Sequence, residues 1–325
     1  MKQLNLVDSL HSATTRNPVF ARHETFHPRF GWIKKGFDAV VKDPEVFLRD
    51  DAPVRLGIGK NMARSIRYWC SAFKMLKEDS TSSKSRLGNS PSRGLWATDL
   101  GSKLLSDEGW DPFLEDPTSL WLLHWNLLKP PCYATAWELT FNHFRQLEFS
   151  AEDLFLALCD YRENLSTRVA DSSLKKDITC ILRMYAEQDS KARPNEETLD
   201  CPFTELGLIY GAGDSKRYLF QVGSKGNLPD EMIVAAALEF SSRVGQKQRT
   251  IALSRLAFDA DSPGLVFKLS ESAISEAIEK VACKSDSIRL EDTAGLIQLS
   301  YTQDPAKLAE DILDEYYRTR RGGAK

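Results

Sequence analysis

The chain has 325 residues, of which 42% are hydrophobic, 27% charged and 10% aromatic. This composition is typical of an ordinary globular protein with two or three domains, and it excludes a collagen-like, largely disordered or membrane-embedded chain. The formal net charge is −3, from 43 basic and 46 acidic residues. Any affinity for nucleic acid must therefore come from a local basic surface and not from the chain as a whole.

The six cysteines are scattered, without a C-x-x-C pair and without histidines at zinc-finger spacing. The first residues, Met1 to Leu10, lack the apolar stretch of a signal peptide, and no run of about eighteen apolar residues occurs anywhere. These features predict a cytoplasmic protein with reduced thiols, and they disfavour a zinc knuckle.

The N-terminal region, residues 1–111, is predicted to be a winged helix-turn-helix domain. A helix over 31–42 is followed by a glycine turn at 57–59 and by a strongly amphipathic helix over 60–77. A serine-rich basic segment, a strand at 95–97 and a short helix capped by a threonine come next. This is the order in which a recognition helix precedes a wing.

One face of the 60–77 helix is apolar and the opposite face is basic, at about 100° per residue. Arginine side chains can bond to guanine, and Asn61 can pair with adenine. Because the basic face lies beside a second basic segment, we favour a DNA-binding surface over a merely solvated helix face. The predicted DNA-binding residues are Lys60, Asn61, Arg64, Arg67, Ser71, Lys74, Lys84, Arg86 and Arg93.

The middle region, residues 112–190, is predicted to be a helical connector or dimerisation bundle, and the chain is expected to form a homodimer through this region or the C-terminal one. Four helices are expected, at about 117–128, 135–146, 150–161 and 173–185. Helices this apolar need partners, which favours a bundle. Three large side chains of the first helix are interpreted as core packing: Trp121, His124 and Trp125.

The C-terminal region, residues 198–325, is predicted to be an α/β unit. Its element order is compatible with a second winged-helix-like unit, although the helix over 271–283 is acidic and a poor candidate for touching DNA. The basic tail (Arg318, Arg320, Arg321 and Lys325) is expected to be disordered. The other expected elements are strands at 206–210, 217–222, 265–269, 288–290 and 296–301 and a helix at 230–244. The whole chain is thus predicted to be a predominantly helical α+β protein.

Residues 23–27 spell H-E-x-x-H, a motif that on a helix places two histidines on zinc with the glutamate as general base. Pro28 disfavours the α conformation of His27, so the required helix would end on its own ligand, and a metalloprotease is disfavoured. Two interpretations stay open. One is a polar cluster that orders the N-terminal segment, and the other is a metal- or phosphate-contacting set of His23, Glu24, His27 and Arg29.

The segment Gly57 to Lys60 resembles the end of a phosphate-binding loop, but Val54 and Asn61 stand where that loop needs Gly and Ser or Thr. What remains is a glycine turn that presents backbone N–H groups to a phosphate at a helix N-terminus. The glycines near residue 211 do not form a dinucleotide fingerprint either, so no nucleotide cofactor is predicted.

Several blocks resemble a domain of unknown function that is found in SspB-like proteins of bacterial DNA phosphorothioation systems. They cover nearly the whole chain, and the first two are quite specific. The blocks are Phe20–Gly36, Leu56–Met62 with Ile66–Trp69, Leu114–Pro117 with Leu120–Trp125, Ser262–Gly264 with Phe267–Leu269, and Asp292–Leu296.

The resemblance implies a component of the machinery that replaces a non-bridging phosphate oxygen by sulfur in one DNA strand. Its partners would be double-stranded DNA, a cysteine desulfurase, an ATPase and an ATP-pyrophosphatase-like protein. The resemblance also implies DNA nicking, which needs a divalent metal such as Mg²⁺ or a general base, and a cationic clamp. The densest such set is His23, Glu24, His27 and Arg29.

Two other functions remain open for the sequence. The first is a non-catalytic DNA-binding scaffold that recruits the sulfur-transfer enzymes. The second is a winged-helix transcriptional regulator, for which a palindromic operator and no metal requirement are expected.

Overall fold

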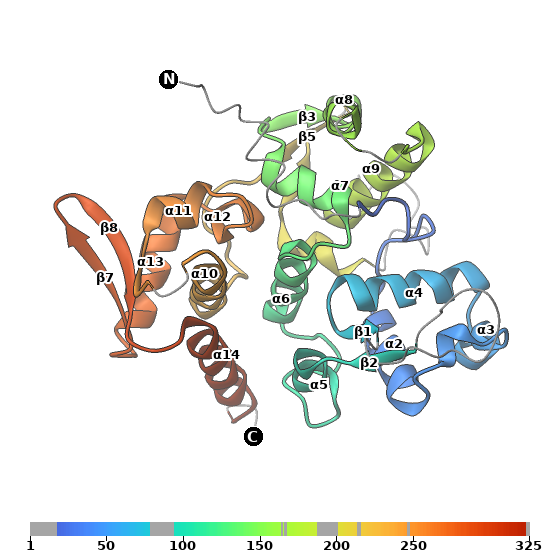
Figure 1. The fold of residues 1–325 in the computed structure, drawn as a ribbon, viewed down its shortest axis with the longest axis horizontal. Helices are drawn as coiled ribbons and strands as arrows, with labels where there is room; N and C mark the ends of the chain where they lie inside the picture. The colour runs from blue at the N-terminus through green and yellow to red at the C-terminus, as the bar shows by residue number, and fades with distance from the viewer. Residues whose placement is uncertain are drawn as a thin grey trace.

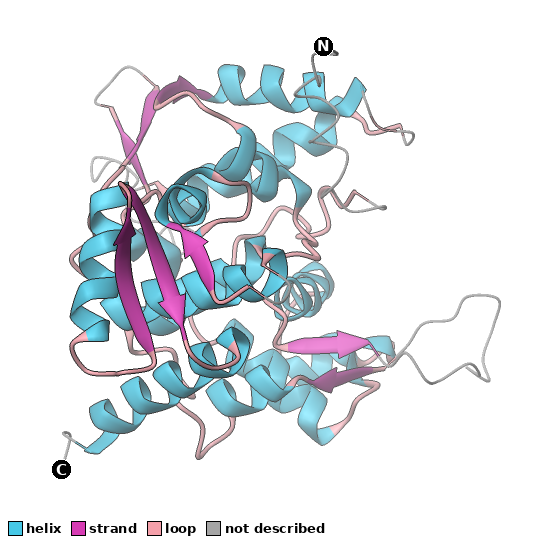
Figure 2. Ribbon diagram, turned by 60° about the vertical axis from the view of Figure 1, so that its left-hand side comes forward, coloured by secondary structure: helices cyan, strands magenta, loops and turns pink. Residues whose placement is uncertain are grey.

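The computed structural model describes residues 18–78, 94–163, 165, 168–186, 201–212, 216–245 and 248–322. Helices dominate, and the strands form one two-stranded and two three-stranded sheets (Figures 1 and 2). The predicted α+β class with a predominance of helix is therefore confirmed. None of the helices in the described part of the chain is long and apolar enough to cross a membrane.

The N-terminal elements come in the predicted order. β1 and β2 pair antiparallel, with Leu76 opposite Ala97, and the Thr98 hydroxyl accepts the Gly101 N–H at 2.9 Å, as expected of an N-cap. The elements are α2 (Trp32–Lys42), a 3₁₀ turn (Val46–Leu48), α3 (Ala52–Leu56), α4 (Lys60–Ala72), β1 (Leu76–Glu78), β2 (Leu95–Ala97) and α5 (Asp99–Leu105).

Helix α4 is shorter than its apolar pattern predicted. The pattern continues to Lys77, whereas the helix ends at Ala72 and the chain enters β1 at Leu76. Lys74 has a left-handed backbone conformation, with φ of 61°, which turns the chain out of the helix. Phe73 and Leu76 are nevertheless buried, because the turn and the strand place them against the same core. Burial alone therefore could not locate the helix end.

The middle of the chain is built around α6, which is buried from Thr118 to Leu128. Trp121, His124 and Trp125 are fully buried, which confirms their interpretation as packing. His124 bonds through Nδ1 to the Tyr185 hydroxyl at 2.8 Å, and burial lowers its pKa to about 3. The elements are α6 (Pro117–Leu128), α7 (Thr135–Glu138), a π-helical turn (Leu139–His143), β3 (Glu148–Ser150), α8 (Ala151–Glu163) and α9 (Asp171–Tyr185).

The C-terminal part contains two small sheets with helices packed around them. β3 from the middle of the chain joins β5 and β4, and β8 lies between β6 and β7. The elements are a 3₁₀ turn (Pro202–Leu206), β4 (Ile209–Gly211), β5 (Arg217–Phe220), α10 (Asp230–Val244), β6 (Thr250–Ala252), α11 (Leu253–Phe258), α12 (Pro263–Val266), α13 (Glu271–Ala282), β7 (Ile288–Thr293), β8 (Leu296–Tyr301) and α14 (Pro305–Gly322).

Two C-terminal expectations were wrong. The strand expected at 265–269 is the short helix α12 and the turn after it, because the Ser262 hydroxyl caps a helix and Gly264 packs against the Ala257 backbone too closely for any Cβ. The basic tail is also helical in its described part, since Arg318, Arg320 and Arg321 lie on α14. Lys325 lies outside the described residues.

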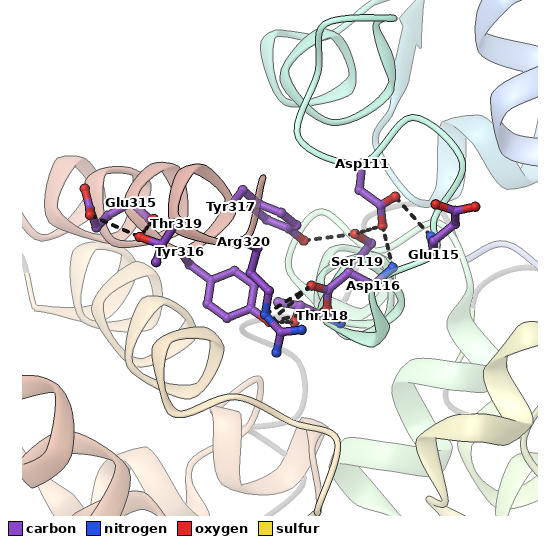
Figure 3. Close-up of polar contacts among 10 residues, drawn as sticks. All are labelled: Asp111, Glu115, Asp116, Thr118, Ser119, Glu315, Tyr316, Tyr317, Thr319 and Arg320. Carbon is purple, nitrogen blue, oxygen red and sulfur yellow. Dashed lines mark hydrogen bonds and ion pairs between the residues drawn. The ribbon is translucent and has the colours of Figure 1, made fainter. Parts of the chain in front are cut away.

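Helix α14 brings the end of the chain back to the start of α6 (Figure 3). The Ser119 hydroxyl donates to Asp111 at 2.6 Å and lies 3.0 Å from the Tyr317 hydroxyl. The Thr118 hydroxyl bonds to Tyr316 at 2.7 Å. On the same helix, Asp314 receives hydrogen bonds from Lys103 and from Trp110.

One hydrophobic core runs through all three predicted regions, from Trp32 to Tyr317. The strands of one sheet and the contacts of α14 both cross the predicted boundaries. The division into residues 1–111, 112–190 and 198–325 therefore stays a prediction.

Substitution of Tyr317 tests whether the contact between α14 and the start of α6 stabilises the fold. Tyr317→Ala removes a buried ring that stacks on Trp110 at 5.0 Å, so we expect a loss of about 3 kcal/mol or more in the free energy of unfolding. Tyr317→Phe keeps the ring and loses only the hydrogen bond to Ser119, which should cost about 1 kcal/mol. Urea unfolding measures both. The exposed Thr319→Ala on the same helix is the control, and equal losses in all three variants would contradict this role for Tyr317.

A candidate nucleic-acid interface along helix α4

A cleft of about 1160 Å³ runs along the outer side of α4. Its floor is formed by α4 side chains from Lys60 to Ser71 and by Lys74 just beyond the helix. Its walls come from residues 19–24, 47–53, 76–78 and 131–133. Gly57 and Gly59 precede α4, and the β1–β2 pair follows it, so α4 lies between two changes of chain direction. The side walls of the cleft come from residues distant in the sequence.

The cleft is cationic although the protein as a whole is weakly acidic. Basic side chains outnumber carboxylates by seven to three among the described residues that line it. A cleft lined by one sign of charge concentrates ligands of the opposite sign. The basic residues are Arg22, Arg49, Lys60, Arg64, Arg67, Lys74 and Lys77, and the carboxylates are Glu24, Asp50 and Glu78.

Two of these carboxylates lie opposite the two central arginines. Glu24 is 3.8 Å from Arg64, and Glu78 is 3.4 Å from Arg67. Both arginines remain partly accessible, with 56% of the Arg64 side chain and 29% of the Arg67 side chain exposed. Exposed ion pairs of this kind contribute little to stability, about 0 to 1 kcal/mol, so an incoming phosphate can replace the carboxylate at small cost.

The predicted DNA-binding residues do not all reach this cleft. Lys60, Arg64, Arg67 and Ser71 line it, as the helical spacing predicted for one face, and Lys74 lines it from beyond the end of the helix. Asn61 is exposed but does not border the cleft. Three further predicted residues lie outside the described part of the chain, namely Lys84, Arg86 and Arg93.

Lys74 differs from the prediction in its surroundings. The sequence placed it on the exposed face of a continuous helix, whereas the helix has ended and the side chain turns inward. Its ammonium donates to the carbonyl oxygens of Asn126, at 2.5 Å, and Lys129, at the end of α6. Burial lowers the pKa of Lys74 to about 7. Lys74 therefore closes one end of the cleft and holds the C-terminal end of α6.

The H-E-x-x-H segment is a turn and not a helix. Ala21, Glu24 and Thr25 all have positive φ angles, which a helix forbids. His23 is fully buried, and its Nε2 lies 2.8 Å from Asp177 on α9. Asp177 also accepts the Ala21 N–H, and burial raises the pKa of this carboxyl. For His23, the geometry fits a polar cluster that orders the N-terminal segment.

The four candidate catalytic residues are spread over different environments. Glu24 lines the cleft, whereas His23 and His27 are buried. The Arg29 guanidinium lies over the Trp32 ring at 5.4 Å. Within the described residues, no group of three or more His, Cys, Asp or Glu side chains is placed to hold a metal ion. The catalytic role of this set stays a prediction.

Sequence reasoning missed Arg22 and Lys77, which are both exposed in the cleft wall. Arg22 lies in the turn before His23, and Lys77 lies on β1 instead of on the predicted helix. Tyr133 was missed as well, because only the fold brings residues 131–133 next to α4. No local pattern marked these three residues as neighbours.

The chain matches the model of a family described as proteins of unknown function, DUF4007, over residues 20–317. It is also similar to a magnesium ion-bound SspB crystal structure, with 38% identity and a TM-score of 0.87 over 95% of this chain and 90% of that chain. A second SspB crystal structure has 37% identity and a TM-score of 0.85 with the same coverage. The search of curated proteins gave no match.

The inward position of Lys74 predicts a pH effect on stability. Because its pKa is about 7 in the folded protein, against an ordinary value of 10.5, the unfolded chain binds the extra proton between these values. The stability of the wild type relative to Lys74→Met should therefore rise as the pH increases from about 7 to about 10. Denaturant unfolding at several pH values measures this difference in the free energy of unfolding. Lys77→Met is the matched control. If the difference between wild type and Lys74→Met did not change with pH, the Lys74 ammonium would not be enclosed as described.

Proposed function

Because the chain belongs to the DUF4007 family and is similar to SspB over 95% of its length, we propose that it is a cytoplasmic DNA-binding component of a bacterial DNA phosphorothioation system. The observation that carries the DNA-binding part is the cationic cleft along α4 in a chain whose net charge is −3. Its partners in this proposal are double-stranded DNA, a cysteine desulfurase, an ATPase, an ATP-pyrophosphatase-like protein and a second copy of the chain.

Phosphate contacts account for most of the affinity in this proposal. Arginines present several N–H donors in a rigid fork, and two of them lie one turn apart on α4 with accessible side chains. Lys60 adds a third cation at the N-terminal end of the helix, where the backbone dipole also favours a phosphate. Contacts of this kind position DNA without reading its sequence.

A winged-helix interpretation of the N-terminal part is supported by element order. α2, α3 and α4 are followed by the antiparallel pair β1 and β2, so α4 stands where a recognition helix precedes its wing. The order α10, β6, α11, α12, α13, β7 and β8 is compatible with a second unit. Its α13 carries exposed Glu276 and Glu279, which disfavours contact with DNA.

Strand nicking is the enzymatic part of the proposal, and it rests on the resemblance to SspB-like proteins. One of the two similar structures is described as magnesium ion-bound. The described residues do not offer a ready group of three ligands for such an ion. Glu24 is the candidate general base because its carboxylate lies in the cleft beside Arg64. A non-catalytic scaffold is the alternative, and it shares the same DNA-binding surface.

Arginine substitutions test the DNA-binding surface. Arg64→Ala and Arg67→Ala should each weaken binding to a duplex several-fold and lower the salt dependence by about one unit in the slope of log K against log salt. Fluorescence anisotropy at several salt concentrations measures both quantities. Arg255→Ala on α11 is the matched control, since Arg255 is also a partly exposed arginine paired with a carboxylate. If Arg255→Ala lost DNA affinity while Arg64→Ala and Arg67→Ala kept it, the proposed surface would be contradicted.

Removing a carboxylate from the cleft should increase DNA affinity, whereas removing an arginine should lower it. Glu78→Gln removes the partner of Arg67 and one negative charge from the cleft, so the protein should bind DNA more tightly, by about two- to fivefold at low salt. The same titration measures this gain, which should fade as salt increases. Weaker binding by Glu78→Gln would show that the cleft does not hold the phosphates.

Glu24→Gln separates the nickase from the scaffold. As a general base, Glu24 is required for cleavage but not for binding, so the variant should lose nicking of a supercoiled plasmid while its DNA affinity stays equal or increases. The assay is run with and without Mg²⁺. Nicking that survives in Glu24→Gln removes this residue from the catalytic set. No nicking by the wild type under either condition favours the scaffold.

A further inference from the structure

The accessibility of α4 falls from its N-terminal to its C-terminal end. Lys60 and Arg64 are exposed, only 29% of the Arg67 side chain is accessible, and Ser71 is half-buried. Lys74 then closes the cleft. A recognition helix enters the major groove of DNA only where its side chains protrude from the protein, because that groove is about 12 Å wide and about 8.5 Å deep. The C-terminal half of α4 is recessed and does not meet this condition.

The recessed end has the features of a nucleotide pocket. The lining residues at this end are Tyr68, Ser71, Lys74, Pro131 and Tyr133. The Tyr133 side chain is 44% exposed, and its carbonyl accepts the Tyr68 hydroxyl at 3.1 Å, which fixes residues 131–133 against α4. Pockets for unstacked bases combine aromatic or apolar faces with a few polar groups.

Charge and size favour the same ligand. Arg67 lies at the entrance of this end and can hold the phosphate of a nucleotide whose base points inward. The whole cleft measures about 1160 Å³, which exceeds the range of about 300–1,000 Å³ that is typical of ligand pockets, so its volume leaves room for a nucleotide. Lys74 uses two of its three N–H donors on carbonyl oxygens of residues 126 and 129.

We propose that the recessed end of the cleft binds an unpaired nucleotide of the DNA with its base against Tyr133, while paired DNA lies over Lys60 and Arg64, and Arg67 at the boundary contacts a phosphate of either form. This inference rests on the proposed function and names the form of DNA that the site takes. It explains why a helix in the position of a recognition helix is set into a cleft.

The test compares three DNA probes of one sequence, namely a fully paired duplex, the same duplex with a central two-base mismatch, and the single strand. Anisotropy titrations of the full chain give the affinities, and 2-aminopurine at the mismatched position reports whether that base changes its stacking. We expect the mismatched duplex to bind about tenfold more tightly than the paired one, as one base stacked on an aromatic ring allows.

Substitutions at Tyr133 locate the effect. Tyr133→Ala should lose most of the preference for the mismatched duplex and the 2-aminopurine signal, whereas Tyr133→Phe keeps the ring and should retain both. The far-UV circular dichroism of all variants should match that of the wild type, which shows that they are folded. Tyr210→Ala is the matched control, because Tyr210 is also a partly exposed tyrosine, on β4, and lies outside the cleft.

The outcomes separate the two proposals. Equal affinity for paired and mismatched duplexes overturns the unpaired-nucleotide site and leaves DNA binding intact. A preference that persists in Tyr133→Ala overturns the location of the site. Failure to bind any of the three probes overturns the proposed function itself.

Discussion

The structure depends on the complete burial of α6. Helix α6 lies near the centre of Figure 1, with α10 and α14 on one side and α4 on the other. Its polar groups are bonded to surrounding parts: the Trp121 and Trp125 indole N–H groups donate to Asn227 and Glu239, and His124 lies between Tyr185 and the Val266 carbonyl. Because a buried polar group without a partner is costly, these bonds fix the positions of the neighbouring elements.

The C-terminal end of α6 positions part of the cationic cleft. Lys74 bonds to carbonyl oxygens at the C-terminal end of α6, and residues 131–133, which directly follow that end, form one wall of the cleft. Lys74 and residues 131–133 thus connect one end of the cleft to the buried α6, whereas the Arg64 and Arg67 side chains are partly accessible and lie beside carboxylates. A cleft with partly accessible arginines suits a polyanion whose phosphates vary in position.

Patterns that depend on neighbouring residues were predictable from the sequence. Helical periodicity located α2, α10 and most of α4, and Thr98 caps a helix as expected. The basic face of α4 was also predictable, because about 3.6 residues per turn place Lys60, Arg64 and Arg67 together whatever surrounds the helix. Each of these features is decided within about four residues of the chain.

Features that depend on distant residues were decided only by the tertiary structure. The sequence alone determined that a basic helix face exists. It could not determine that Lys74 turns inward, that His23 pairs with Asp177, or that Tyr133 borders the cleft, because these contacts join residues 52 or more positions apart. Whether a histidine or lysine serves as a surface ligand or as a buried partner is settled by desolvation and by the bonds available after folding.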